Sequence, residues 1–228
     1  MLTVDNKNCW MKDSCSHADC DTFCLKHFKL DYLFGEALVP HEMRKKPEFY
    51  LYANDPDKDV YDYLSSVSNN IIEFVGAGKN LYLYSSQCGC GKTSWAIVLL
   101  QSYLNKIWYR SELTCRALFI NVPQFLLALK ENISNKSEYV EHIKKNILSA
   151  DIVVWDDIAT KAITSFEAEN LLSFIDGRIF HGKSNIFTSN LGKDELKEAV
   201  GDRLYSRIFN ASDAIQFRGL DKRKLKTQ

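Results

Sequence analysis

The chain has 228 residues, of which 46% are hydrophobic and 25% charged, the balance of a globular protein able to bury a core. Lysine plus arginine and aspartate plus glutamate both number 29, so net charge gives no sign of a nucleic-acid partner and any basic surface must be local. No apolar run reaches membrane-spanning length, and the first residues lack a signal-peptide core, which predicts a cytosolic protein without a membrane partner. Cysteines in that compartment are more often metal ligands or core residues than disulfides.

Four of the seven cysteines lie within the first two dozen residues. Zinc takes four thiolate or imidazole ligands, commonly in pairs separated by two to four residues. The spacings of Cys15, Cys20 and Cys24 fit this rule, whereas the spacing before Cys15 is longer. A short polar segment buries little apolar surface, so a bound metal would explain how it folds. We therefore predict a zinc module over residues 1–30, with free cysteines as the alternative. The expected ligands are Cys9, Cys15, Cys20 and Cys24, with His17 or His27 as substitutes.

A polar connector over residues 31–60 contains three of the four prolines and is predicted to be a linker with short helical pieces. From residue 61 to 228, strand and helix patterns alternate, which predicts one α/β domain with a parallel sheet. A helix is expected around 61–75, followed by a turn at "GAGKN" and a strand at 81–84. Further strands are expected at 117–122, 151–156, 185–190 and 214–219. Five strands with intervening helices are the layout of a phosphate-loop (P-loop) ATPase.

The stretch "SSQCGCGKTS" joins the first strand to an apolar run typical of a helix. Its end matches the phosphate-loop pattern, whereas Ser86 stands where the leading glycine is expected. Gly89 and Gly91 can turn consecutive N–H groups toward an anion at a helix N-terminus. The strand–loop–helix context argues against a chance match in a surface turn. We predict that Lys92 reaches the β- and γ-phosphates of ATP and that Thr93 binds magnesium. The predicted nucleotide-binding residues are Ser86, Gln87, Cys88, Gly89, Cys90, Gly91, Lys92, Thr93 and Ser94.

Two polar motifs follow later apolar strands. Asp156 and Asp157 end the run "DIVVWDD", and ligands bind at the carboxyl ends of strands in open α/β sheets. Asp156 is therefore predicted to hold the magnesium shell, and Asp157 to orient the attacking water. Asn190 ends "NIFTSN" and is predicted to hydrogen-bond the γ-phosphate or the water. A helix-capping or turn role is the alternative for each motif.

Two basic motifs lie near the C-terminus. In "GDRLYSRIFN", Arg203 and Arg207 are four residues apart on one predicted helix face. Either they form surface ion pairs, or one is an arginine finger for a neighbouring subunit, because a planar cation stabilises the transition state of phosphoryl transfer. In "FRGLDKRK", Arg223 is a candidate cation that senses nucleotide. The tail also offers a local strip for single-stranded DNA, or only a solvated tail, in Lys222, Lys224 and Lys226.

The order of these motifs resembles one family. The stretches "CGCGKTS", "VVWDDI", "NIFTSNL", "GDRLYSRI" and "GLDKRK", over residues 80–224, are similar to AAA+ helicase loaders of bacteria and phages. These are the DnaC and DnaI type, whose close relatives include the IstB transposition ATPases. The resemblance implies an AAA+ domain that hydrolyses ATP between subunits, with Asn190 as sensor 1, Arg207 as the likelier finger and Arg223 as sensor 2. Asp157 stands where many AAA+ proteins have glutamate, which is usual in this subfamily.

The resemblance also implies a function. The protein is expected to bind a hexameric, DnaB-type replicative helicase and deliver it onto single-stranded DNA in the bacterial cytoplasm, whether the gene is chromosomal or phage-borne. DnaI-type loaders are similar in having an N-terminal zinc module that grips the helicase. The expected cofactors are ATP, Mg²⁺ and Zn²⁺. An IstB-like regulator of a DNA transposase and a helicase-binding adaptor with little ATPase activity are the alternatives, and Ser86 favours the second of them.

Overall fold

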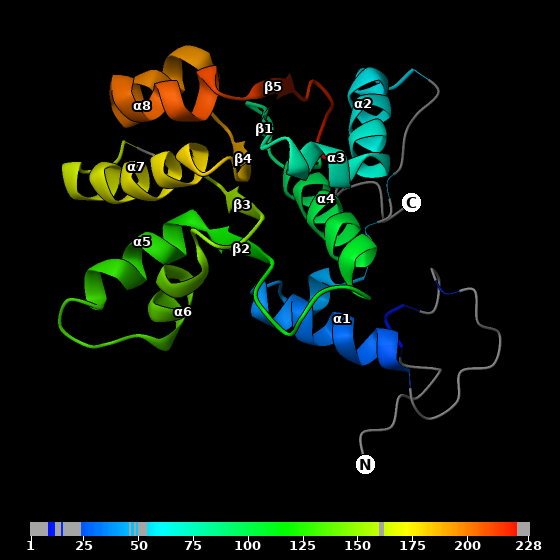
Figure 1. Cartoon of the computed structure of the whole chain (residues 1–228). Coiled ribbons are helices and arrows are strands. Elements are labelled where there is room, and N and C mark those ends of the chain that lie inside the picture. Colours follow the sequence, from blue (N-terminus) through cyan, green and yellow to red (C-terminus); the bar gives the residue numbers. More distant parts are fainter. Residues whose placement is uncertain are drawn as a thin grey trace.

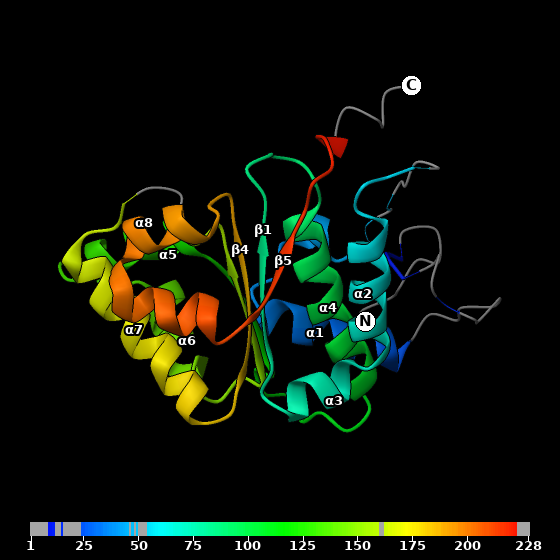
Figure 2. The same ribbon diagram turned by 90° about the horizontal axis from the view of Figure 1, so that it is seen from above.

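The computed structural model describes residues 9–11, 15, 24–45, 47, 49, 54–159 and 162–222. Within them, parallel strands form one sheet in the order β2-β3-β4-β1-β5, with helices on both faces (Figures 1 and 2). Each strand overlaps an expected one, so the predicted five-stranded parallel sheet is confirmed. The strands are β1 (Asn80–Tyr84), β2 (Ala117–Asn121), β3 (Ile152–Asp156), β4 (Ser184–Ser189) and β5 (Asp213–Gln216).

One face of the sheet is covered by a layer centred on α4 (Figure 1). Most residues of α4 are buried because this helix lies between the sheet and the other helices of its layer. The helix expected around residues 61–75 is divided into α2 and α3, and the "GAGKN" turn precedes β1 as predicted. The elements of this layer are α1 (Leu25–Glu36), the 3₁₀ turn η3 (His41–Met43), α2 (Lys58–Asn69), α3 (Ile71–Gly76) and α4 (Lys92–Ile107).

Helix α1 crosses the expected boundary between zinc module and linker at residue 30. Leu30, Leu33 and Phe34 are at most 1% exposed and belong to the same apolar core as α4. The N–H of Phe119, on the edge strand β2, donates to the carbonyl of Ala37 at 2.7 Å, so the segment also covers a sheet edge. The described first half of the connector therefore packs on the α/β domain, in contrast to the expected linker.

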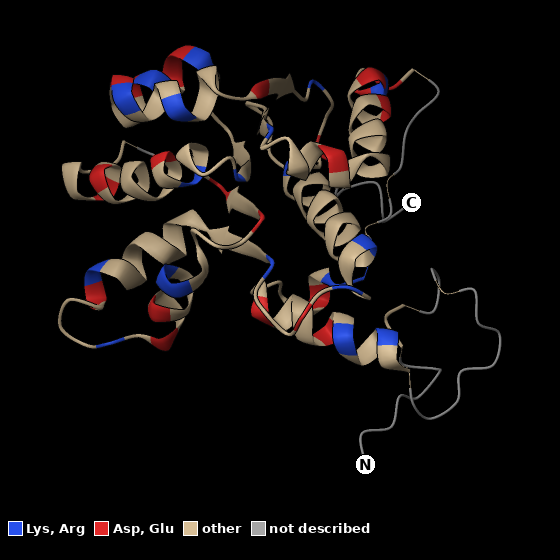
Figure 3. Ribbon diagram, viewed as in Figure 1, with Lys and Arg blue, Asp and Glu red and all other residues tan. Residues whose placement is uncertain are grey.

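The other face of the sheet carries a second layer with its own apolar core (Figure 1). Figure 3 shows basic and acidic residues interspersed on α8 and around the α5–α6 pair, consistent with the zero net charge. No helix in the described ranges is long and apolar enough to cross a membrane. The elements of this layer are α5 (Val122–Glu131), α6 (Glu138–Asn146), α7 (Ser165–Phe180), α8 (Lys193–Tyr205) and the π turn η4 (Ser206–Asn210).

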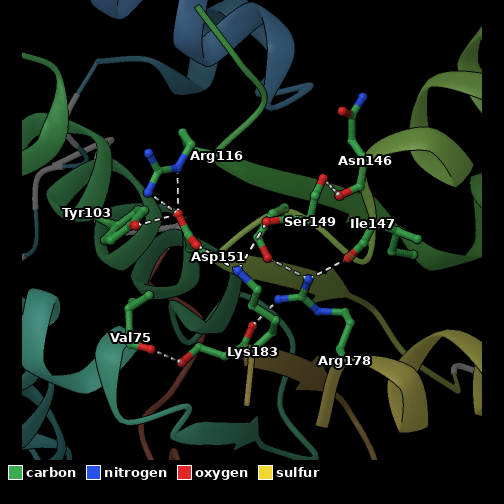
Figure 4. Close-up of polar contacts among 11 residues, drawn as sticks. Val75, Tyr103, Arg116, Asn146, Ile147, Ser149, Asp151, Arg178 and Lys183 are labelled. Carbon is green, nitrogen blue, oxygen red and sulfur yellow. Dashed lines mark hydrogen bonds and ion pairs between the residues drawn. The ribbon is translucent and has the colours of Figure 1, made fainter. Parts of the chain in front are cut away.

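A polar network ties the strands together at their amino ends, opposite the edge where a nucleotide is expected (Figure 4). Asp151, just before β3, accepts hydrogen bonds from Tyr103 at 2.7 Å and Arg116 at 2.6 Å, and from Lys183 at 2.9 Å. Burial opposes ionisation of Asp151, yet these donors hold its pKa below the ordinary value. The fully buried Arg178 donates to the carbonyls of Ala150 and Ser184 beside this cluster. The network fixes the sheet end that does not carry the predicted chemistry.

Candidate nucleotide site

The loop between β1 and α4 has the backbone that the motif predicts. Gly89 and Gly91 adopt φ angles of 73° and 106°, which glycine reaches without steric cost. Gly91 caps the N-terminus of α4, so the loop leads directly into the positive end of a helix. The Lys92 side chain is buried against this loop, and its Nζ donates to the carbonyl of Gln87 at 3.0 Å. An anion at the loop would therefore meet free helix-terminal N–H groups and a lysine ammonium.

Ser86 occupies the position of the missing glycine without backbone strain. The non-glycine residues with positive φ in the described ranges are Leu38, Asp157 and Ala159, so Ser86 does not adopt the left-handed conformation. Its side chain is exposed, whereas that of Ser85 is buried and accepts the Gln87 N–H at 3.1 Å. A serine is thus compatible with this loop.

The residues predicted to hold magnesium are in direct contact. The Thr93 hydroxyl, in the first turn of α4, donates to Oδ1 of Asp156 at 2.8 Å, and the buried Thr188 hydroxyl donates to the same oxygen at 2.8 Å. Burial raises the pKa of Asp156 above the ordinary value, which the two hydroxyls only partly oppose. Mg²⁺ in nucleotide sites takes one or two protein oxygens together with phosphates and waters. The hydroxyl and carboxylate found here fit that donor set.

Asp157 follows β3 in an uncommon conformation. Its φ is 56°, a region that aspartate tolerates better than most residues, and its N–H donates to the Thr188 hydroxyl at 2.9 Å. Thr188 therefore orients both acidic residues, a role that sequence reasoning did not assign although it singled out the motif. Asp157 also lines a cavity of about 250 Å³ between α5 and the start of α7, together with apolar residues such as Leu126 and Ile163. The half-buried carboxylate thus borders an open space beside the Asp156 contact.

Three other predicted catalytic residues lie after β4 and on the molecular surface. Asn190 follows β4, which lies between β3 and β1, and the preceding Ser189 accepts the Ser85 N–H at 3.3 Å. Arg203 is exposed at the end of α8, and Arg207 lies in the following π turn, where it pairs with Asp176 of α7. The helix type therefore changes between the two arginines. Neither arginine contacts the phosphate loop of its own chain in these interactions. A finger that acts on the nucleotide of a second subunit must be free of its own loop in this way.

Residues 37–226 match the family described as IstB-like ATP binding protein. The chain belongs to this family. The resemblance inferred from the motif order is thereby confirmed, and the IstB-like match includes every motif that carried it. No curated protein matches the chain by sequence.

Solved structures share the fold of this IstB-like chain. The DnaC helicase loader is 18% identical with a TM-score of 0.62, over 78% of this chain and 100% of that one. DnaI is 20% identical with a TM-score of 0.56, over 81% of this chain and 94% of that one. AMPPCP-bound DnaA from Aquifex aeolicus is 20% identical with a TM-score of 0.55, over 74% of this chain and 48% of that one. This chain thus spans about half of that DnaA, and at these identities the likeness establishes the fold.

The predicted zinc ligands of the IstB-like chain are only partly described. Cys9 Sγ lies 3.4 Å from Nδ1 of His27, and Cys24 Sγ accepts the His27 N–H at 3.4 Å, capping α1. Cys15 is half-buried, whereas Cys20 and His17 lie outside the described residues. Among the described residues, no three or more His, Cys, Asp or Glu side chains form a group that could hold a metal. The described ligands therefore do not complete a zinc site.

The tail of the IstB-like chain differs from the expected basic strip. The Lys222 side chain is only 12% exposed and its Nζ lies 3.1 Å from Asp55 Oδ2. Its charge is consequently not available to DNA, because a buried carboxylate already holds it. Lys224 and Lys226, and the expected sensor Arg223, lie outside the described residues. Sequence reasoning missed this pairing because Asp55 belongs to a connector that was expected to be a linker.

Proposed function

We propose that this protein is an AAA+ ATPase that binds a hexameric replicative helicase and delivers it onto single-stranded DNA. The observation that carries the ATPase part is the hydrogen bond between Thr93 and Asp156, beside Lys92 at the start of α4. A lysine, a hydroxyl and a carboxylate in this arrangement suit a nucleoside triphosphate with its magnesium ion. Membership of an ATP-binding family supports the same part. The folds of the DnaC helicase loader and of DnaI support the helicase part.

The proposed hydrolysis assigns a task to each side of the site. The loop N–H groups and Lys92 bind the β- and γ-phosphates, and Thr93 and Asp156 hold magnesium, which neutralises phosphate charge when bound. Asp157 orients and polarises the attacking water, and Asn190 hydrogen-bonds that water or the γ-phosphate. The structure supports this division because Thr188 holds the backbone of Asp157 and the carboxylate of Asp156 in fixed relation.

Self-assembly through the ATPase domain is part of the proposal. Arg207 and Arg203 are exposed on the α8 side of the molecule, where a second subunit can approach. Arg207 is proposed as the finger that stabilises charge on the phosphates of a neighbouring site, with Arg203 as the other candidate. To act as a finger, Arg207 must break its ion pair with Asp176 and pair with a phosphate of the neighbouring subunit's nucleotide instead. Arg223 is proposed as a further sensor of the nucleotide.

The N-terminal residues are proposed to bind zinc and the helicase. Cys9 Sγ lies beside the His27 ring, which is consistent with zinc binding by this segment, whereas Cys24 Sγ caps the backbone of α1. Elemental analysis of protein purified without chelator tests this directly, with about one zinc per chain expected. If the purified protein contains no zinc, the zinc proposal is wrong and the cysteines are free thiols.

The family description favours a second candidate, an ATPase that regulates a DNA transposase. Both candidates use the same nucleotide site, so their partners distinguish them. Tagged full-length protein with ATP should co-purify with a replicative helicase and not with an IS21-type transposase. The reverse result would replace the loader by the transposition regulator.

The nucleotide site itself is tested by two substitutions and a matched control. Lys92→Ala should abolish binding of labelled ATP, whereas Asp157→Ala should keep binding and lose hydrolysis. Lys144→Ala removes an exposed cation on α6 whose partner is Glu141, away from the α8 side, and should change neither. Normal ATP binding by Lys92→Ala would refute the assignment of the loop. Binding without turnover by the wild-type protein, alone or with helicase and DNA, would favour an adaptor.

A further inference from the structure

A buried charge cluster joins the two ends of the domain beside the phosphate loop. Asp55 and Asp57 are 6% and 0% exposed, although both lie in the connector before α2. Lys222 Nζ lies 3.1 Å from Asp55 and 3.6 Å from Asp57. The same ammonium donates to the Tyr61 hydroxyl at 3.2 Å and lies 4.3 Å from the centre of that ring. Burial opposes its charge, yet the bonds to Tyr61 and Asp55 hold the pKa of Lys222 above the ordinary value.

Asp57 also holds the backbone of the C-terminal segment. Its carboxylate accepts the N–H groups of Arg218 at 2.6 Å and Gly219 at 3.0 Å. A Cβ atom on Gly219 would lie 2.5 Å from Asp57 Oδ2, so only glycine permits this approach. Residues 218, 219 and 222 of the C-terminal segment are thus all bound to one buried pair of carboxylates. Removing the Lys222 ammonium would leave two buried carboxylates without their counter-charge, so the three side chains hold one another in this arrangement.

This fastened segment reaches the phosphate loop. The backbone N–H of Lys222 donates to the carbonyl of Gly89 at 3.0 Å. Peptide bonds in the described residues are trans, so the N–H of Cys90 points away from the Gly89 carbonyl of the same peptide unit. Holding the carbonyl toward the tail therefore turns the Cys90 N–H to the other side. Gly89 is at positive φ and has no Cβ, so its own side chain does little to fix this peptide, and the contact with the tail supplies a restraint.

We propose that Lys222, Asp55 and Asp57 form a strap that holds the Gly89–Cys90 peptide in the orientation that binds phosphate. Lys222 is then a positioning residue, since it acts through the loop backbone. Preorganised donors bind an anion more tightly because the loop loses less freedom on binding. By linkage, a bound nucleotide stabilises the strap as much as the strap stabilises the nucleotide. The inference rests on the proposed ATP site and adds to it a contact from outside the phosphate-loop motif.

The test compares the wild type with two strap variants and one control. Lys222→Met removes the ammonium, and the double variant Lys222→Met, Asp55→Asn also removes one carboxylate, so that the cluster keeps its net charge. Lys197→Met removes the ammonium of an exposed pair on α8. Hydrogen exchange of nucleotide-free protein is followed in residues 85–92 and, for reference, in strand β1. ATP affinity and melting temperature are measured on the same samples.

The strap predicts faster exchange in residues 85–92 with unchanged exchange in β1, and ATP affinity lower by about tenfold, the worth of one backbone hydrogen bond. These changes should appear in the double variant even if Lys222→Met alone does not fold, and should be absent from Lys197→Met. Unchanged loop exchange, or exchange that rises equally in β1 as the protein melts earlier, would overturn the strap. A wild-type protein that binds no ATP would instead refute the proposed function, while the exchange data would still decide the strap.

Discussion

Phe34→Ala measures how firmly α1 belongs to the α/β domain. The Phe34 ring is fully buried in the core that α1 shares with α4, and it packs edge-on against Trp10 with ring centres 5.2 Å apart. Truncating a buried phenylalanine to alanine costs about 3–5 kcal/mol through lost burial and the cavity left behind. A domain has about 5–15 kcal/mol of stability in total, so a large part of it would be lost.

The assay is urea unfolding followed by circular dichroism, with a thermal melt on the same samples. In a domain of this size about 1 kcal/mol shifts the melting temperature by roughly 2–4 °C, so Phe34→Ala should melt about 6–20 °C earlier. Its urea midpoint should fall without a change in slope, because the same surface unfolds. Leu25→Ala is the matched control on the same helix, since Leu25 is 60% exposed and should cost less than about 0.5 kcal/mol.

Equal stability of the two variants would refute the packing of α1 on the domain. A separate early transition in the wild type, removed by Phe34→Ala, would also refute it, because α1 would then unfold as an independent module. The result decides how partner binding should be mapped. Deleting residues 1–45 would remove Phe34 from the core along with the cysteines, whereas deleting residues 1–23 leaves α1 whole and removes Met11 and the Trp10 contact from that core. The shorter deletion, with a thermal melt to show that the domain still folds, tests whether the front segment binds the helicase.

Three further predictions concern the rest of the molecule. Native contacts lower the pKa of Asp151, so the ionised carboxylate stabilises the folded protein fully above its ordinary pKa near 4, and this contribution is lost as the pH falls through the pKa in the folded protein. Urea midpoints measured between pH 2 and 7 should therefore fall less steeply on the acid side in Asp151→Asn than in the wild type. Arg207→Ala should still bind ATP but suppress turnover, and mixing it with Lys92→Ala protein should restore some hydrolysis; absence of rescue, with wild-type turnover independent of concentration, would favour a finger acting within one chain or none. Ser86→Gly should bind ATP as tightly as wild type or more so, and a large loss of affinity in a titration would show that the serine has a role of its own.

The sequence by itself determined the sheet and the centre of the candidate site. Short apolar runs bounded by turn residues mark each strand locally, and the phosphate-loop motif depends on backbone geometry that Gly89 and Gly91 supply within one turn. Once the strands are parallel, their carboxyl ends must share one edge. The contact between Thr93 and Asp156 follows from that rule, although 63 residues separate them.

Only the tertiary structure decided which polar residues are buried. Lys222 and Asp57 look like solvated residues of a tail and a connector, and their pairing spans 165 positions of sequence. Burial of a charge depends on whether a partner of opposite sign lies within a few ångströms, which local sequence does not encode. The same applies to α1, whose buried apolar residues stabilise the protein only because α4 and the edge strand β2 lie against this segment. Arg207 likewise has its partner on α7, so its state before assembly is a property of the fold and not of its motif.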